Sequence, residues 1–289
     1  MIPTASTETD HDVGRSIFGV DVAGYEDGRP KYPEAVYAAP EASGALLRGI
    51  DAFEVGPGTG QATRRLLEAG VASLVAIEPD TRLAAYLAAR YPAATVINAG
   101  FEDADLEPAS FDLGIAATSF HWIDARRGLS RAVALLRPGG WWAMWWTLVH
   151  DPAGDAFSRA VLPLLRKVTL PPSLSGSDHV HWSLDVPARL AEMRAAGMVD
   201  PTSTMLEFEF EMSAKQLRAL YATFSMIRRL DPVSARSTLD AIEMVALDVF
   251  GGAVRRTFRV PLYLARKPGN APPADDRPAS RGISRQAVS

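Results

Sequence analysis

Three glycines at alternate positions, Gly56, Gly58 and Gly60, constrain this chain more than any other feature. They stand between an apolar, strand-like segment, 50–55, and a helical pattern over 61–69. Glycine is required where the backbone takes positive φ, or where a ligand must come closer than a Cβ allows. A glycine-rich turn between a strand and a helix is how open α/β sheets build nucleotide sites. The sequence therefore predicts a tight strand-to-helix turn at a ligand site.

Strand-like and helix-like segments alternate beyond this turn. The expected strands are 50–55, 71–77, 94–97, 111–117, 141–149, 206–212 and 258–264. The first five lack strict polar alternation and are separated by helical patterns, which is typical of a parallel sheet covered on both faces. We therefore expect an α/β, Rossmann-like, doubly wound fold with a mostly parallel, seven-stranded sheet. Pro261 lies inside the last strand and predicts a bulge or a strand end there.

The chain reads as one domain with mobile ends. Residues 1–20 are polar and predict a flexible N-terminal arm, and the Pro/Arg/Ser-rich residues 268–289 predict a disordered tail. A single domain is expected over 21–267. Helical patterns at about 151–200 and 213–250 interrupt the strand pattern, and we expect these two insertions, with the N-terminal arm, to form a lid that excludes water.

Composition excludes several classes of protein. The 289 residues contain no cysteine, which excludes disulfides, thiolate catalysis and cysteine-based metal centres. The formal net charge is −4 and no long run of Lys and Arg occurs, so a nucleic-acid partner is not suggested. The longest apolar stretch, 139–149, is well short of the ~20 residues that a membrane helix needs. With no secretory signal, a cytoplasmic location is expected by default. Nothing indicates the oligomeric state.

Acidic residues next to the glycine turn narrow the choice of nucleotide. A pyrophosphate dinucleotide site prefers Gly-x-Gly-x-x-Gly, whereas here the third glycine comes one position early and Gln61 follows it. Glu54, just before the turn, is a poor neighbour for phosphates but suits a cation. Glu78 ends the next strand and can accept two ribose hydroxyl protons. This arrangement fits S-adenosylmethionine, whose ammonium Glu54 can balance directly or through water.

Residues 25–147 resemble a class I S-adenosylmethionine-dependent methyltransferase of the small-molecule branch that includes trans-aconitate methyltransferase. Each of seven short motifs is weak alone, and their order and spacing are typical of the family. They lie at 25–33, 54–60, 77–80, 100–102, 110–113, 120–122 and 136–140.

The resemblance implies a set of cofactor-binding residues. They are Tyr25, Arg29, Glu54, Gly56, Gly58, Gly60, Glu78, Pro79, Phe101, Glu102 and Thr118. Tyr25 and Arg29 would hold the methionine carboxylate, and Glu78 the ribose hydroxyls. The backbone N–H of Phe101 would meet adenine, with Glu102 near its exocyclic amine. Relatives usually have alanine at the position of Phe101, so we expect adenine to be packed differently here.

Aromatic residues after the fourth and fifth strands are candidates for the acceptor side. His121 follows the fourth strand, where the transferred methyl group lies in this family, and is a candidate base toward a substrate hydroxyl. A structural or cofactor-side role is the alternative. Trp122 either shields the cofactor or belongs to the core. Trp146 shares a strand face with Trp142 and lies near the carboxyl end of that strand, where it is expected to line the substrate pocket.

The expected activity is methyl transfer from S-adenosylmethionine to an oxygen, carbon or nitrogen of a small-molecule acceptor, with S-adenosylhomocysteine as product and a place in secondary metabolism. The alternatives are a protein of the same fold that uses the cofactor for a cyclisation or rearrangement, and a non-catalytic binding module. His179 and His181 alternate on a strand without a third ligand, so no metal site is expected. The glutamates at 207, 209 and 211 predict a solvated strand face.

Overall fold

The structure is a computed structural model, and it describes residues 28–149, 155–165, 174–175 and 180–269. Four of the sequence predictions fall wholly or mostly outside these ranges. The arm at 1–20, Tyr25 and His179 lie outside them, as does the predicted tail except for its first two residues.

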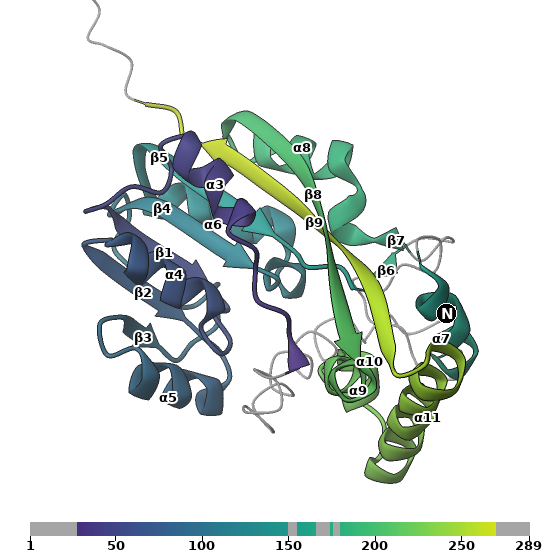
Figure 1. Cartoon of the computed structure of the whole chain (residues 1–289). Coiled ribbons are helices and arrows are strands. Elements are labelled where there is room, and N and C mark those ends of the chain that lie inside the picture. Colours follow the sequence, from purple (N-terminus) through teal and green to yellow (C-terminus); the bar gives the residue numbers. More distant parts are fainter. Residues whose placement is uncertain (1–27, 150–154, 166–173, 176–179, 270–289) are drawn as a thin grey trace, which may run out of the picture.

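One seven-stranded sheet organises the chain, with strand order β3-β2-β1-β4-β5-β9-β8 (Figure 1). Its strands are β1 (Asp51–Val55), β2 (Ser73–Ile77), β3 (Thr95–Ile97), β4 (Phe111–Ala117), β5 (Leu136–Trp145), β8 (Val199–Ser213) and β9 (Ala253–Arg266). Strands β1 to β5 pair in parallel, and β9 pairs antiparallel with both β5 and β8. The predicted mostly parallel, Rossmann-like sheet is confirmed. A separate pair joins β6 (Leu174–Ser175) and β7 (Val180–His181).

Side-chain caps start several of the helices. They are α3 (Ala35–Ala42), α4 (Gln61–Ala69), α5 (Thr81–Arg90), α6 (Ala125–Leu135), α7 (Ala156–Leu165), α8 (Val186–Ala195), α9 (Ala214–Ala222), α10 (Ser225–Arg228) and α11 (Pro232–Phe250), with short 3-10 turns η2 (Phe120–Trp122) and η3 (Trp182–Leu184). Asp80 and Asp124 accept backbone N–H bonds at the starts of α5 and α6. Ser213 and Gln216 form a capping box at the start of α9.

Two hydrophobic cores lie on the two faces of the sheet. The alternation along β5 shows the division: Trp142 and Trp146 belong to the core that includes Met193 of α8, and Trp145 belongs to the core that includes Leu66 of α4. The predicted split of the tryptophans between two faces is therefore confirmed. The parallel strands are covered on both sides, so their carboxyl ends remain the place for a site.

The long β8–β9 hairpin extends beyond the sheet (Figure 1). Pairing between β5 and β9 covers only 141–145 and 262–266, whereas β8 and β9 stay paired to the end of β8 at Ser213 and the start of β9 at Ala253. The helices α9, α10 and α11 connect these two ends. A third core gathers there around Phe258, Tyr221 and Phe157, from β9, α9 and α7. The hairpin thus closes the sheet at one end and carries a helical subdomain at the other.

The prediction of a bulge or strand end at Pro261 is wrong. Pro261 lies within β9 and pairs in register with Met205 of β8. Its carbonyl accepts the N–H of Trp146, which directly follows the last residue of β5. In a β-strand the C=O and the N of one residue point to the same side, so the missing N–H of Pro261 is on the side where β5 has already ended. The ladder loses little there, which is why the strand continues through proline.

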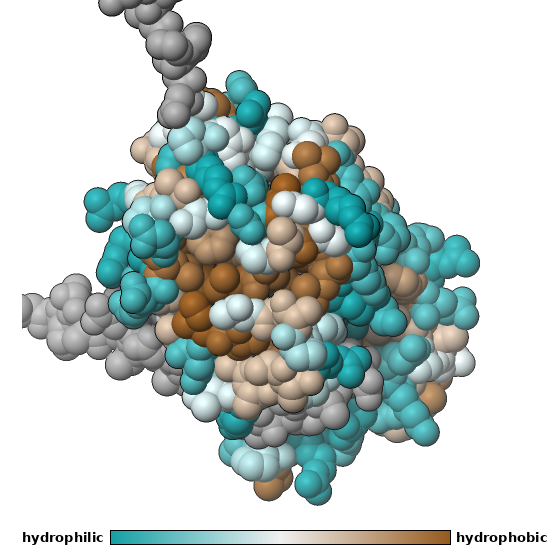
Figure 2. All heavy atoms as spheres, turned by 90° about the vertical axis from the view of Figure 1, so that its left-hand side faces the viewer, coloured by the Kyte–Doolittle hydropathy of each residue, from teal (hydrophilic) through white to brown (hydrophobic). Residues whose placement is uncertain are grey.

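The surface is not uniformly polar. Figure 2 shows hydrophobic residues gathered at the centre of the face that lies to the left in Figure 1, with hydrophilic residues around them. Within the described ranges, the helices are too short or too polar to span a bilayer.

Candidate functional site

The three turn glycines have different reasons to be glycine. All have positive φ, at 62°, 59° and 88° for Gly56, Gly58 and Gly60. A Cβ on Gly56 would lie 2.6 Å from Cβ of Ser119, and one on Gly60 would lie 2.4 Å from Cε2 of Tyr91. A Cβ on Gly58 would meet no described atom within 4 Å. The first and third glycines therefore let chains pack closely, while Gly58 leaves bare backbone facing open space.

Glu54 is a buried carboxylate with one oxygen in use. Its side chain is 1% exposed, and Oε2 accepts a hydrogen bond of 2.6 Å from the hydroxyl of Thr63 in α4. Oε1 is buried without a partner among the residues that the structure describes. Burial raises the pKa of Glu54 to about 7, the Thr63 hydroxyl opposes the rise, and the charge of Glu78 adds to it. A cation brought to Oε1 would restore the charged form.

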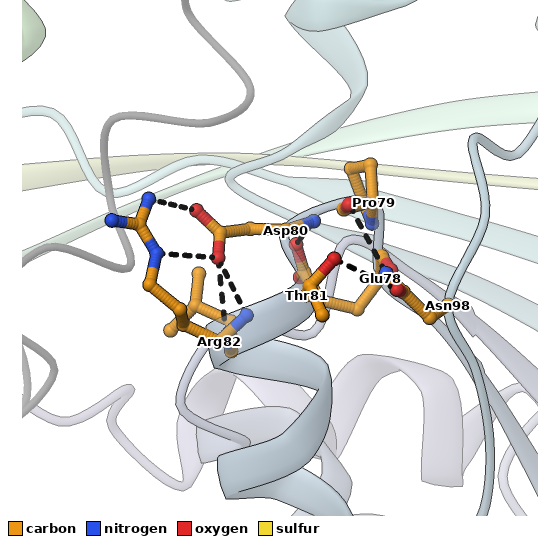
Figure 3. Close-up of polar contacts among 7 residues, drawn as sticks. Glu78, Pro79, Asp80, Thr81, Arg82 and Asn98 are labelled. Carbon is orange, nitrogen blue, oxygen red and sulfur yellow. Dashed lines mark hydrogen bonds and ion pairs between the residues drawn. The ribbon is translucent and has the colours of Figure 1, made fainter.

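Glu78 directly follows β2, and Figure 3 shows it beside Pro79, Asp80 and Asn98. Its Oε2 accepts the N–H of Gly58 at 3.0 Å, and its Oε1 accepts the N–H of Asp80 at 3.0 Å. Asn98 fixes the main chain by donating to the carbonyls of Glu78 and Pro79 at 2.9 and 3.1 Å. Burial raises the pKa of Glu78 to about 7, and the two backbone N–H groups lower it. Each carboxylate oxygen retains a lone pair for a ligand hydroxyl.

A cavity lies between the glycine turn and the ends of β1, β4 and β5. It is lined by Arg29, Pro30, Tyr32, Glu54, Gly56, Pro57, Gly58, Thr59, Gln61, Ala62, Ala117, Thr118 and Thr147. Arg29 supplies a guanidinium and Glu54 a carboxylate to the same space. This pair of opposite charges suits a zwitterionic amino-acid group.

Arg29 is positioned by a residue far along the chain. Its Nε donates to the hydroxyl of Thr223, just after α9, at 2.8 Å. Its guanidinium carbon lies 5.6 Å from the ring centroid of Phe224. Gly28 presses so closely on α9 that an added Cβ would lie 2.5 Å from the carbonyl oxygen of Ala219. The helical subdomain therefore sets the position of a cavity residue, which no local sequence signal indicated.

Thr118 lines the cavity and has a strained backbone conformation. It has φ of 59°, a region that a β-branched residue rarely adopts. Its N–H donates to the carbonyl of Trp145 at 2.7 Å, and its hydroxyl lies 2.9 Å from that of Tyr32. Thr147 also faces the cavity, and its hydroxyl is buried without a partner among the described residues. Tyr32 and Thr147 were missed from the sequence; Tyr32 stood inside a matched motif, and Thr147 gave no signal.

Phe101 belongs to the core as well as to the expected adenine region. Its side chain is 3% exposed and stacks on Phe53, with centroids 5.9 Å apart at 13°. The guanidinium of Arg131 lies over the Phe101 ring, with its carbon 5.5 Å from the ring centroid. The departure from alanine thus has a packing reason. Its backbone contact with adenine and the part of Glu102 stay predictions.

His121 and Trp146 meet in a second cluster. The indole Nε1 of Trp146 donates to Nδ1 of His121 at 2.9 Å. The His121 ring lies 4.8 Å from that of Trp122 and 5.7 Å from that of His181. Burial lowers the pKa of His181 to about 4, so this imidazole is neutral at neutral pH. Sequence reasoning named all four residues and did not foresee that they touch.

The structure gathers some of the predicted residues and separates others. Arg29, Glu54, Gly56, Gly58 and Thr118 line one cavity. Glu78 joins them through the N–H of Gly58, and Gly60 shapes the turn from behind. The remaining predicted residues do not line that cavity; they are Pro79, Phe101, Glu102, His121, Trp122 and Trp146.

Known proteins are similar to the central segment of this chain. Residues 53–144 match the sequence model of a family described as "methyltransferase domain". An uncharacterized methyltransferase of Mycobacterium tuberculosis is 32% identical over 162 residues, which cover 53% of this chain and 64% of the relative. An uncharacterized methyltransferase of Schizosaccharomyces pombe is 25% identical over 136 residues, covering 47% and 54%. The chain therefore spans less than two thirds of the curated relatives that it matches.

Solved structures share the fold. A candidate type II methyltransferase from Anaeromyxobacter dehalogenans has a TM-score of 0.60 and 25% identity, over 83% of this chain and 99% of its own. Phosphoethanolamine N-methyltransferase 2 of Haemonchus contortus, solved with S-adenosyl-L-methionine, has a TM-score of 0.55 and 13% identity, over 92% and 61%. At that identity the second likeness shows the fold alone.

Proposed function

We propose that this chain binds S-adenosylmethionine and transfers its methyl group to an oxygen, carbon or nitrogen of a small-molecule acceptor. The observation that carries the proposal is the buried Oε1 of Glu54, which has no partner in the described ranges, on a residue that lines the same cavity as Arg29. The match of residues 53–144 to a methyltransferase domain supports it.

The residues present fit the cofactor. Arg29 suits its carboxylate and Glu54 its ammonium, and the bare backbone of Gly58 allows close approach. Glu78 suits the ribose diol, because its two oxygens are already aligned by backbone donors. A ligand that carries both an ammonium and a diol satisfies both acids, whereas the phosphates of a dinucleotide would meet two carboxylates.

The cofactor would supply an electrophilic methyl group, and the chain would orient the two reactants and exclude water. Charge separation falls as an electron-rich acceptor meets a sulfonium, so a site that excludes water favours the reaction. Helices α7, α9, α10 and α11 are the proposed lid, since α9 touches the chain at Gly28 and Thr223 holds Arg29. Most of the rate enhancement would come from orientation of the two reactants.

Calorimetry with the purified full-length chain tests the cofactor. We expect S-adenosylmethionine and S-adenosylhomocysteine to bind, and a nicotinamide dinucleotide to give no heat. Arg29→Gln should weaken binding of S-adenosylhomocysteine, whereas the control Arg64→Gln, on the exposed side of α4, should not. Tight binding of the dinucleotide with no binding of S-adenosylhomocysteine would sink the proposal.

Incubation with methyl-labelled cofactor and a panel of small molecules tests the reaction. Label recovered in a small-molecule product supports methyl transfer. A product that needs the cofactor but carries no label would favour the alternative, a cyclisation or rearrangement on the same cofactor site.

A further inference from the structure

Two side chains of opposite charge line the cofactor cavity, Arg29 and Glu54. The Oε1 atom of Glu54 is buried and has no partner within the described chain, so the Arg29 guanidinium does not bond to that oxygen. A buried carboxylate is costly without a cation, and a long arginine side chain that shares its cavity is the obvious cation to turn toward it. The fold must therefore hold the guanidinium away from Glu54.

Thr223, in the connection between α9 and α10, provides that hold. Its hydroxyl donates to the carbonyl of Leu220 at 2.6 Å and accepts the Nε–H of Arg29 at 2.8 Å. A hydroxyl has one proton and two lone pairs, so the bond to Leu220 turns the lone pairs outward as acceptors. Thr223 is fully buried, and its own position is fixed by packing. The acceptor for Nε–H is thus preformed by α9.

The neighbours of Thr223 fix the same arginine. The guanidinium carbon of Arg29 lies 5.6 Å from the ring centroid of Phe224, which itself contacts Tyr221 in the core of the helical subdomain, with centroids 4.8 Å apart. A Cβ on Gly28 would lie 2.8 Å from Cγ2 of Thr223, so the backbone before Arg29 is pressed against this connection. Thr223 takes only Nε–H, and the other four N–H donors of the guanidinium are on the two terminal nitrogens.

We propose that Thr223 is a positioning residue that holds Arg29 apart from Glu54, so that the cavity keeps two separated charges for a ligand with a carboxylate and an ammonium on one carbon. The inference rests on the proposed function and deepens it, because it assigns selectivity for the amino-acid end of the cofactor to the helical subdomain. Thr223 does not line the cavity and acts through Arg29. A nucleoside without an amino-acid group gains nothing from this arrangement.

Calorimetry of the full-length chain with two probes tests the proposal. S-adenosylhomocysteine and methylthioadenosine share the adenosine part, and only the first carries the amino-acid group. Thr223→Val keeps the shape of the side chain and removes the hydroxyl. We expect it to weaken S-adenosylhomocysteine binding by about tenfold or more, as loss of a hydrogen bond to a charged group implies, and methylthioadenosine binding by less than about threefold. Equal weakening of both probes, or of neither, would overturn the proposal.

Two further variants serve as controls. Thr223→Ser keeps the hydroxyl and loses only the γ-methyl group, so it should bind both probes nearly as the wild type does. Thr238→Val removes a hydroxyl in α11 that also donates to a backbone carbonyl, that of Ser234 at 2.9 Å, at a residue outside the cavity lining. It should change neither affinity. A loss of S-adenosylhomocysteine binding in Thr223→Ser as large as in Thr223→Val would contradict the role of the hydroxyl.

Nitrogen-15 NMR of the ligand-free wild type tests the hydrogen bond even if Thr223→Val does not fold. Arg29→Gln identifies the Nε–H signal of Arg29 by its loss. We expect this proton to exchange with water about tenfold or more slowly than the Nε–H of Arg64, whose side chain is 46% exposed. Exchange as fast as that of Arg64 would overturn the proposal. If neither probe binds the wild type, the proposed function fails; if both bind and Thr223→Val leaves their ratio unchanged, only the role of Thr223 fails.

Discussion

Two sets of glutamates in this molecule have opposite surroundings. Glu54 and Glu78 end neighbouring parallel strands and are buried, with 1% and 4% of their surfaces exposed. The glutamates at 207, 209 and 211 alternate along β8 and are exposed. Glu207 pairs with Arg259 at 2.9 Å and Glu209 with Arg255 at 3.9 Å, across the hairpin. The predicted solvated face of β8 is confirmed.

The difference follows from strand topology. Parallel strands end at one edge of the sheet, so their terminal acids converge under the glycine turn and lose water. In the antiparallel hairpin, alternate residues face solvent along its whole length, and each acid can meet a base on the next strand. Burial makes the charged forms of Glu54 and Glu78 unfavourable, and a cationic ligand can relieve this cost. The acids of β8 stay in contact with water and lie beside arginines of β9.

The largest expected effect of this contrast is on pH dependence. The pKa values of Glu54 and Glu78 are raised from 4.5 to about 7, so the folded chain binds more protons than the unfolded chain between these values. Stability from these groups is full below about pH 4.5 and is lost as pH rises through 7, by about 2–3 kcal/mol for each carboxylate. Urea unfolding of the ligand-free chain at pH 5 and pH 8 measures the loss.

The comparison is made with a double variant, because other groups also titrate. Glu54→Gln combined with Glu78→Gln should remove most of the loss between pH 5 and pH 8. Glu207→Gln combined with Glu209→Gln should leave it as in the wild type. If the free energy of unfolding depends on pH equally in the wild type and both double variants, burial of charged Glu54 and Glu78 does not destabilise the fold.

Glu78→Ala should give the next largest effect, on cofactor affinity. Loss of buried, charge-assisted hydrogen bonds to the ribose is expected to weaken binding of S-adenosylhomocysteine by about 1–3 kcal/mol. Calorimetry measures it, with Glu68→Ala as the control, since Glu68 only joins an exposed ion pair with Arg64. An unchanged affinity would exclude Glu78 as the ribose ligand.

Gly28→Ala tests how far the helical subdomain shapes the cofactor cavity. The new Cβ would lie 2.5 Å from a backbone oxygen of α9, so the chain must shift and carry Arg29 away from Thr223. We expect a loss of about 1–2 kcal/mol in cofactor affinity, the size of a small overpacking cost. Gly269→Ala, which meets nothing within 4 Å, is the control. If Gly28→Ala binds the cofactor as tightly as the control does, the helical subdomain does not shape the cofactor cavity.

The smallest effect is expected on the hairpin. The ion pair between Glu207 and Arg259 is about half exposed on both sides, so it should contribute less than about 1 kcal/mol to stability. A double-mutant cycle with alanine at both positions measures the coupling by urea unfolding. If the coupling free energy of this pair were as large as the stability loss assigned to Glu54 between pH 5 and pH 8, the exposed acids would matter as much to stability as the buried ones, and the contrast would be wrong.

The parallel half of the molecule could be predicted closely, because its signals are local. Asp80 and Asp124 cap α5 and α6, the helices that follow β2 and β4. The antiparallel half was predicted less well. Strand β8 begins seven residues before the predicted 206, and Pro261 does not interrupt β9. Those lengths depend on cross-strand partners that are distant in sequence, and no local propensity encodes them.

The sequence by itself determined the turn and the acids beside it. Glycine spacing is a backbone requirement, and an acid at a strand end is placed by the period of the strand, so both are visible without a fold. Only the tertiary structure decided that Thr223 holds Arg29 across 194 residues, and that Trp146 donates a hydrogen bond to His121. Such contacts depend on which elements pack together and on where single side-chain atoms point, and these are properties of the folded chain alone.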